Sequence, residues 1–343
     1  MQKELEEHIK SIHENFTIVD AHLDLLWDVE KRRRKGEKQI IETYHLPDFK
    51  EGGANIIVSS IYITEDYLPE LGLRKALDQI SAFYSELDES GDKIKFIKSY
   101  ADVKDALDNK MIGILLSFEG VDPLMNDIGL LRLFYELGVR GVGITWSRRN
   151  FAGDGCSFSK IEDKKNGLSK FGEEVVTEAE KLGMIIDVSH LNEAGFWDVM
   201  KITTKPVIAS HSNCRALHKI MRNLSDEQIK AIAKTDGVIG INGVSSIVAE
   251  GHADIKALAD HIDHLKSIAG INHIGLGFDF CDKIFGHNTD PKSKKEDEDY
   301  DVVNGYPDIY RLTEELIARG YSDNEIKLIY GGNFLRVYEN ILK

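Results

Sequence analysis

Metal-binding side chains are the first feature of this 343-residue sequence that could do chemistry. His22 and Asp24 are two residues apart, so in an extended strand their side chains point to the same side. An imidazole nitrogen beside a carboxylate oxygen suits a borderline-soft cation such as zinc. A strand end that faces solvent would carry the same pair, so this spacing alone leaves both interpretations open.

Four more candidates each follow a different apolar, β-branched run of the chain: Glu119, His190, His211 and Asp279. Singly, each has an ordinary interpretation, and Glu119 before Gly120 could be a turn carboxylate. With the first pair, the set supplies three histidines and two carboxylates as ligands on four strand ends. That is enough for two metal ions, with Glu119 placed to bridge them. Two divalent ions would leave the site positive enough to attract a carbonyl oxygen.

These side chains need a fold that brings them to one place. Apolar runs alternate with helical patterns, which indicates parallel strands covered on both faces. The expected strands are Thr17–Ala21, Asn55–Ile63, Met111–Ser117, Gly141–Thr145, Gly183–Val188, Pro206–Ala209, Val238–Ile241 and His273–Gly277. The expected helices include Gly72–Leu87, Leu130–Leu137, Phe171–Leu182, Asn192–Ile202, Ser225–Thr235 and Asp254–Ala269. Eight βα units over about 270 residues match an α/β TIM (β/α)8 barrel, whose catalytic groups meet at the carboxyl ends of the strands.

A doubly wound open sheet is the competing fold. A dinucleotide-binding sheet of that kind has a glycine-rich turn after its first strand. Here the first strand runs into His22 and Trp27 without a glycine, so the barrel is favoured. We expect one barrel domain over residues 1–343, with an N-terminal helical extension at 1–16, a loop insertion at 281–308 after the eighth strand, and closing helices within Tyr321–Leu342.

The composition limits the kinds of partner that we expect this protein to bind. Lys and Arg number 43 against 58 Asp and Glu, a formal charge of −15, and an acidic chain repels nucleic-acid phosphates. The basic run Lys31–Lys35 is expected to be a solvated face. No apolar stretch approaches the ~20 residues that span a bilayer, so we expect no membrane segment. Three scattered cysteines, Cys156, Cys214 and Cys281, are typical of reduced thiols in the cytoplasm.

Seven other histidines lie on expected helices or loops, or at the opening of the eighth strand, without a partner pattern. We expect them to be surface or structural residues: His8, His13, His45, His252, His261, His264 and His273.

Five short motifs occur in order along the chain: His22-Leu-Asp24, Ser117-Phe-Glu119-Gly120, Asp187-Val-Ser-His190, Ser210-His-Ser-Asn213 with Arg222-Asn223, and Gly275-Leu-Gly-Phe-Asp279-Phe. In sequence and spacing they resemble the renal (membrane) dipeptidases, peptidase family M19, in a bacterial-type form. Two further stretches, residues 167–172 and 331–336, are also similar to that family. The resemblance runs from about Ile18 to Tyr338.

The resemblance implies a zinc-dependent dipeptidase that hydrolyses dipeptides with a free C-terminal carboxylate through a metal-bridging hydroxide. It implies two Zn²⁺ ions, with other divalent ions possible, and a homodimer. It assigns His22 and Asp24 to one ion, His190 and His211 to the other, and Glu119 to both.

Two further roles are implied by the same resemblance. Asp279 would carry a proton from the water to the leaving amine; the alternative is a carboxylate that steadies His22. Arg222, with Asn223 beside it, would grip the substrate carboxylate through a bidentate fork.

One position departs from the mammalian members, whose fourth strand ends in Thr-His. Here the match is Thr145-Trp146, and an indole cannot act as an imidazole, although its N–H is a donor. Trp146 therefore either packs at the mouth of the site or contacts substrate. Cys281 stands where the family often has a second Asp, and we expect it to be a buried filler rather than a ligand.

Two rival functions remain at this point. Another binuclear-metal amidohydrolase would act on a lactone, a cyclic amide or an N-acyl amino acid, but those barrels commonly bridge the metals with a Lys after strand four. A catalytically inactive barrel that only binds a ligand is the second rival. It would have no need to keep Asp279 and Arg222.

Overall fold

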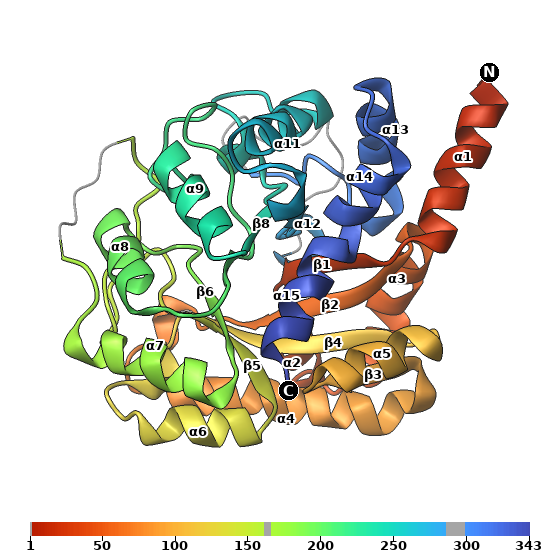
Figure 1. The fold of residues 1–343 in the computed structure, drawn as a ribbon. Helices are drawn as coiled ribbons and strands as arrows, with labels where there is room; N and C mark the ends of the chain where they lie inside the picture. Colours follow the sequence, from red (N-terminus) through yellow and green to blue (C-terminus); the bar gives the residue numbers. More distant parts are fainter. Residues whose placement is uncertain (1, 161–165, 286–298) are drawn as a thin grey trace.

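A closed ring of parallel strands forms the centre of the computed structural model, which describes residues 2–160, 166–285 and 299–343 (Figure 1). Its eight strands are β1 (Ile18–Leu23), β2 (Ala54–Ile61), β4 (Ile112–Glu119), β5 (Val139–Gly143), β6 (Ile185–Asp187), β7 (Val207–Ala209), β8 (Val238–Ile241) and β9 (Ile274–Leu276). The ring is complete because β2 pairs with both β1 and β4, while β9 pairs with β1. This confirms the predicted TIM barrel.

Each of the eight predicted strands coincides with a barrel strand, but one strand was not predicted. Strand β3 (Ile94–Ile97) pairs with the first half of β4, from Ile112 to Leu115. Strand β5 pairs with the same edge of β4, but only from Leu116 onward. The short β3 therefore extends the sheet beside the amino-terminal half of β4 and does not enter the ring.

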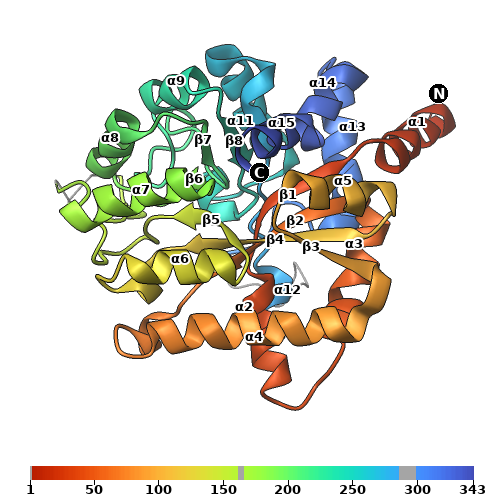
Figure 2. The ribbon, with the colours of Figure 1, turned by 60° about the horizontal axis from the view of Figure 1, so that its bottom comes forward.

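Helices surround the strands, and Figure 2 shows α4, α6, α7 and α9 placed around the outside of the ring. The helices that follow barrel strands are α2 (Leu25–Arg33), α3 (Leu46–Gly52), α4 (Gly72–Ser90), α6 (Gly129–Glu136), α7 (Lys170–Leu182), α8 (Glu193–Ile202), α9 (Asp226–Lys234), α10 (Ser245–Val248), α11 (Ile255–Ala269), α12 (Asp282–Phe285) and α13 (Tyr310–Ala318). Strand β3 is followed by α5 (Tyr100–Asp108). Ser99 and Ser225 cap α5 and α9 with reciprocal capping boxes, which fixes where these helices begin.

The amino-terminal end of the barrel is closed by α15 (Asn333–Ile341), which follows α14 (Asp323–Lys327). Phe334, Val337 and Tyr338 of α15 pack with inward-facing strand residues such as Val19 and Val58. The predicted closing helices are thus present. Because this end is filled by side chains, a site can open only at the opposite end, where the strands finish.

Residues outside the ring complete the fold. Helix α1 (Gln2–Asn15) lies beside α13 at the periphery (Figure 1). Within the expected insertion at 281–308, residues 286–298 lie outside the described residues, and Asp282–Phe285 form α12. In the ranges that the structure describes, no helix is both long enough and apolar enough to cross a membrane.

Candidate metal centre

All six candidate side chains lie at the carboxyl ends of barrel strands. Two are strand residues, on β1 and at the last position of β4, and the other four follow β1, β6, β7 and β9: His22, Glu119, Asp24, His190, His211 and Asp279. The strand ends therefore bring together residues that are up to 257 positions apart in the sequence, and they do so at the end of the barrel that α15 leaves open.

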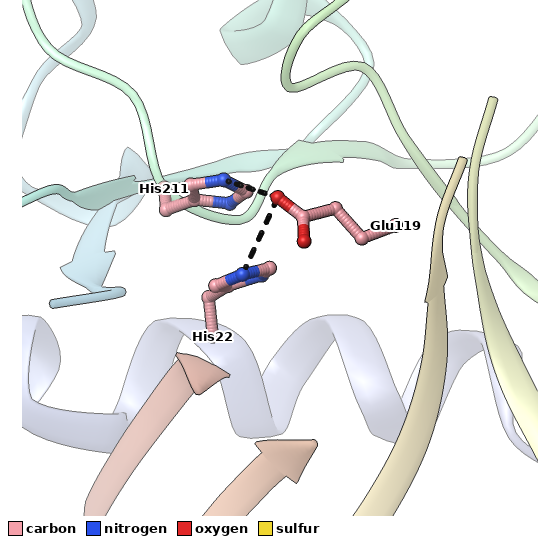
Figure 3. A group of neighbouring side chains, drawn as sticks. All are labelled: His22, Glu119 and His211. Atoms are coloured by element: carbon pink, nitrogen blue, oxygen red, sulfur yellow. Dashed lines mark ion pairs between the residues drawn. The ribbon is translucent and has the colours of Figure 1, made fainter. Parts of the chain in front are cut away.

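Glu119 is the centre of the group, and Figure 3 shows its carboxylate pointing between two imidazole rings. Its Oε1 lies 3.0 Å from Nε2 of His190 and 3.6 Å from Nε2 of His211. The same oxygen lies 3.6 Å from Nε2 of His22. The rings of His22 and His211 stack with centroids 3.7 Å apart. One carboxylate oxygen thus faces three imidazole nitrogens that come from three strand ends.

A second group shares His22. Its Nε2 lies 4.0 Å from Oδ1 of Asp24 and 3.7 Å from Oδ1 of Asp279. A carboxylate that steadied the His22 ring from behind would instead contact the other ring nitrogen. Asp279 therefore lies on the side of His22 that faces the group, rather than behind it.

Hydrogen bonds fix which nitrogen of His190 carries a proton. The Arg222 guanidinium can only donate, and its Nη2 lies 3.2 Å from Nε2 of His190, so this nitrogen is the acceptor. The proton of the neutral ring is then on Nδ1, which donates to Oγ of Ser147 over 2.8 Å. The Nε2 lone pair of His190 faces the group.

The same reasoning applies to His211. The Ser210 hydroxyl donates its one proton to Asp187, so Nδ1 of His211 must donate to the Ser210 oxygen, 2.6 Å away. The Nε2 atoms of His190 and His211 are 2.9 Å apart. In the neutral rings both are lone-pair nitrogens, and two such atoms repel each other unless a cation lies beside them.

Burial governs the electrostatics of the site. It lowers the pKa of His22 to about 3 and lowers the pKa of His190 and His211 well below the usual range, with the charge of Arg222 acting in the same direction. Burial also raises the pKa of Glu119 well above its usual range, and the charge of Asp24 raises it further. Neutral imidazoles beside crowded carboxylates bring lone pairs and negative charges together. This arrangement is unfavourable without a cation and binds cations well.

The donor set therefore fits divalent metal ions. Nε2 of His22 is buried and has no hydrogen-bond partner among residues 2–160, 166–285 and 299–343. The ligand atoms of His22, Glu119 and His211 lie within 4.8 Å of one another, as do those of His22, Asp24 and Asp279. Nitrogen and carboxylate oxygen donors of this kind are what zinc takes in proteins.

Two residues of the site have left-handed backbones. His190 has φ +66° and Asp279 has φ +59°, a region that residues other than glycine rarely adopt and that typically costs about 1–3 kcal/mol. Such backbones persist where the surroundings over-determine them, as at functional sites. Here each lies three residues beyond the end of its strand, His190 after β6 and Asp279 after β9.

The predicted carboxylate-binding residue, Arg222, is 2% exposed and borders the group. It donates through Nη1 to Ser212 Oγ (2.8 Å) and through Nη2 to the carbonyl of His211 (2.7 Å). Its Nε has no hydrogen-bond partner within the described part of the chain. Asn223 is buried and its amide donates to the carbonyls of His218 and Ile247, so it fixes the loop that carries Arg222.

Trp146 lies at the edge of the group, with its ring 5.8 Å from that of His190 and 6.2 Å from the half-exposed Phe158. Tyr62 lies on its other side, with ring centroids 5.4 Å apart. Trp146 therefore lies at the edge of the group, among His190, Phe158 and Tyr62.

Comparison with known proteins agrees with this geometry. The sequence profile of the membrane dipeptidase family, peptidase family M19, matches residues 6–343. This chain belongs to that family. It is 34% identical over 270 residues to an uncharacterized protein in the pqqA 5′ region of Klebsiella pneumoniae, a match that covers 77% of this chain and 94% of that protein.

Solved structures of the M19 family share the fold. The dipeptidase AC, a metallo peptidase of family M19, is 25% identical with a TM-score of 0.84, and the match covers 95% of this chain and 99% of that one. A metallo peptidase from Rhodobacter sphaeroides, liganded with a phosphinate mimic of the dipeptide L-Ala-D-Ala, is 24% identical with the same score and coverage. Membership confirms the resemblance and makes this chain an enzyme, a metallo-dipeptidase that uses divalent metal.

Several residues of this M19 site were not singled out from the sequence. Ser147 orients His190, and Asn242 donates to Asp279 Oδ2 over 3.1 Å. Tyr62 and Arg148 border Trp146. The signal that could have found them was position: Ser147 and Arg148 directly follow Trp146, and Tyr62 falls in a predicted strand.

The remaining expectations concern residues away from the centre. The three cysteines are buried thiols. Cys281 donates to Asp301 over 3.2 Å, and Asp301 also accepts the backbone N–H groups of Cys281 and Asp282. These hydrogen bonds tie the segment after β9 to Asp301. Within the basic run, Arg33 differs from the expected solvated face, because it is partly buried in an ion pair with Glu89.

Proposed function

We propose that this chain hydrolyses dipeptides with a free C-terminal carboxylate, using two divalent ions, with zinc as the expected metal. The observation that carries the proposal is the position of Glu119, whose one oxygen faces the Nε2 atoms of three histidines. His22 and Asp24 would hold one ion and His190 and His211 the other, with Glu119 shared. When bound, the ions would supply an activated water and polarise the peptide carbonyl.

In this proposal Asp279 moves the proton that peptide hydrolysis must transfer to the leaving amine. Its Oδ2 is held by the amide of Asn242, while its Oδ1 faces the group. The side chain is 24% exposed, so a substrate amine can reach it. Anchoring one oxygen leaves the other free to take a proton and to donate it.

The position of Arg222 beside the group supports a role in binding the substrate carboxylate. The buried Nε of Arg222 has no hydrogen-bond partner among the residues that the structure describes, and a substrate carboxylate oxygen would supply one. The guanidinium is already oriented by Ser212 and by the His211 carbonyl, so it can bind without losing rotamer freedom. This supports substrates that end in a free carboxylate.

The two rivals fit less well. A barrel of the lysine-bridged amidohydrolase type needs a Lys after the strand that ends in this chain at Gly143, whereas Glu119 occupies the centre here. A binder without catalysis has no use for an anchored Asp279 at the group. The expected homodimer and the expected cytoplasmic location stay predictions.

The test is turnover of a dipeptide panel in both stereochemistries at the C-terminal residue, with metal content measured on the same preparation. We expect hydrolysis that needs divalent metal and is lost in Asp279→Asn with metal content retained. Exposed Asp66→Asn is the matched control. Hydrolysis of a lactone or an N-acyl amino acid in preference to every dipeptide would contradict the proposal.

A further inference from the structure

Tyr62 stands beside the central carboxylate of the metal centre. Strands β2 and β4 pair in register up to Ile61 and Phe118. Tyr62 and Glu119 are the next residues on these parallel strands, so they lie side by side. Side chains two apart on a strand share a face, and Ser60 donates to the Asp24 carboxylate. Tyr62 therefore faces the site.

The Tyr62 ring packs at a tilt against Trp146 and lies beside the Arg148 guanidinium. It packs against Trp146 with centroids 5.4 Å apart, and the Arg148 guanidinium carbon lies 5.5 Å from the Tyr62 ring and 5.2 Å from the Trp146 ring. Arg148 is anchored by Asp122 (3.2 Å) and by the carbonyl of Ile63 (2.7 Å). The Tyr62 ring is thus held by two neighbours, Trp146 and the anchored Arg148.

The backbone at Tyr62 is fixed as well. Its carbonyl accepts a hydrogen bond from Gln79 of α4 over 2.7 Å. Burial raises the pKa of the Tyr62 hydroxyl to about 12, and the charge of Glu119 also raises it while Arg148 opposes the change. A phenol in this setting keeps its proton at neutral pH and can serve as a hydrogen-bond donor.

We propose that Tyr62 is a further catalytic residue, whose hydroxyl donates a hydrogen bond to the scissile carbonyl oxygen as negative charge develops on it. The inference rests on the proposed dipeptide hydrolysis. It explains how this chain does without the imidazole that the mammalian members carry where Trp146 stands. No bond to the tyrosine oxygen forms or breaks, and the phenol keeps its proton throughout. Arg148 is a positioning residue: its guanidinium lies over the Tyr62 and Trp146 rings and donates a hydrogen bond to the Tyr62 side chain.

Tyr62→Phe tests the hydroxyl alone, because it keeps the ring and its packing. We expect kcat to fall about 100-fold, the loss typical of one removed oxyanion donor, while KM and metal content stay near those of the native enzyme. Affinity for a phosphinate dipeptide mimic, which presents a tetrahedral oxyanion, should fall by a similar factor. Affinity for the uncharged-carbonyl substrate should not. Tyr67→Phe, five residues along the chain, is the matched control.

A second variant separates the donor role from packing. Trp146→His returns an imidazole to the position that the mammalian pattern uses. In the Tyr62→Phe background it should recover at least about tenfold in kcat, because one donor replaces another. Arg148→Met should lower kcat without raising KM, and Arg148→Lys should restore part of the loss because it keeps the cation over the rings.

The outcomes are separable. If Tyr62→Phe leaves both kcat and phosphinate affinity within about threefold of the native values, where loss of a donor predicts far more, the inference is overturned. Loss of metal or of folded protein in Tyr62→Phe also overturns it, because the role is then structural. If the native enzyme cleaves no dipeptide while it binds metal, the proposed function fails first, and this inference fails with it.

Discussion

The backbone N–H of Cys214, three residues after His211, donates to Nδ1 of His261 on α11 over 3.1 Å. The other ring nitrogen, Nε2, must then carry the proton, and it donates to the carbonyl of Val248 over 2.8 Å. The buried imidazole is thus held as the neutral tautomer and ties the His211 loop to the helical layer. This confirms the structural interpretation of His261, and it makes the loop sensitive to acid.

His261 should make the protein less stable in mild acid. Burial lowers the pKa of His261 to about 4 in the folded state, against 6.5 for the free side chain. Above 6.5 the ring is neutral in both states, and its contribution to stability is fully present. As the pH falls from 6.5 toward 4, only the unfolded chain gains the proton, so the free energy of unfolding decreases by about 1.4 kcal/mol for each pH unit.

Urea unfolding near pH 7 and near pH 5 measures this change in the metal-loaded protein. The variant His261→Gln should show a smaller difference between the two pH values than the native chain, whatever its absolute stability. His252→Gln, at an exposed histidine, should keep the native difference. Equal differences in the native chain and in His261→Gln would remove His261 as the acid-sensitive group.

Glu119→Ala should lose both metal ions, because it removes the only ligand that the two ions are proposed to share. Elemental analysis of the native protein should give close to two divalent ions per chain. A variant that keeps one tightly bound ion would show that the ions are held independently, and the shared-ligand proposal would be wrong.

Glu119→Gln offers a second measurement at the same position. Without metal, burial raises the pKa of the Glu119 carboxyl, and repulsion from the charges of Asp24 and Asp279 raises it further. A neutral amide avoids this repulsion. We expect metal-free Glu119→Gln to melt at a higher temperature than metal-free native protein, while addition of zinc stabilises only the native protein.

Ser210→Ala should weaken metal binding without touching a ligand. The Ser210 hydroxyl links Asp187 to Nδ1 of His211 and so keeps Nε2 free for the metal. Loss of such a supporting bond typically lowers metal affinity about 10–100-fold. Competition with a chromophoric chelator measures the change, and Ser81→Ala, at an exposed serine on α4, is the control. An unchanged affinity would mean that other contacts set the His211 tautomer.

The sequence predicted the barrel, and the grouping of six candidate side chains at its strand ends, for a simple physical reason. Parallel strands that are buried on both faces appear as continuous apolar runs, and a polar residue directly after such a run lies at the carboxyl end. His22 and Glu119 could be assigned in this way. Strand β3 could not, because four residues with Lys95 in the middle give no apolar run.

Contacts between residues that are far apart in the sequence could not be predicted from it. Nothing in the order of residues indicates that Tyr62 comes to lie beside Glu119, since this depends on the β2–β4 register. His45 gave no partner pattern, yet it is buried against Asp28 at 2.9 Å. Asn223 was predicted to bind substrate from its place after Arg222; its amide donates to the carbonyls of His218 in the same loop and of Ile247 on α10.

Arg222→Lys keeps the positive charge but loses the planar fork, so it should hold a carboxylate poorly. With free dipeptides we expect KM to rise about tenfold or more, in line with the loss of a charge-assisted hydrogen bond. Amidating the C-terminus should greatly impair the native enzyme and barely affect the variant. Equal impairment by amidation in both proteins would place the substrate carboxylate elsewhere.

Trp146 tests how much of the substrate range is set by the mouth of the site. Its indole fills the space between Phe158 and Tyr62, within ring-contact distance of both. Trp146→Ala should open this space, so that dipeptides with bulky side chains become better substrates relative to Ala-Ala. Because the hydroxyl of Tyr62 remains, kcat for Ala-Ala should fall by less than in Tyr62→Phe, that is, by less than about 100-fold.

If Trp146 were instead a catalytic donor, Trp146→Ala would give the opposite result. The indole N–H is a donor, and if it were the group that stabilises the developing oxyanion, Trp146→Ala would lose turnover of every dipeptide alike. Metal content and folding would stay normal, and the relative preference for side chains would not change. Measuring kcat/KM for Ala-Ala and for a dipeptide with an aromatic side chain in Trp146→Ala, Trp146→Phe and the native enzyme distinguishes the two. Trp146→Phe keeps most of the ring but has no N–H, so full activity in that variant would assign Trp146 to selectivity alone.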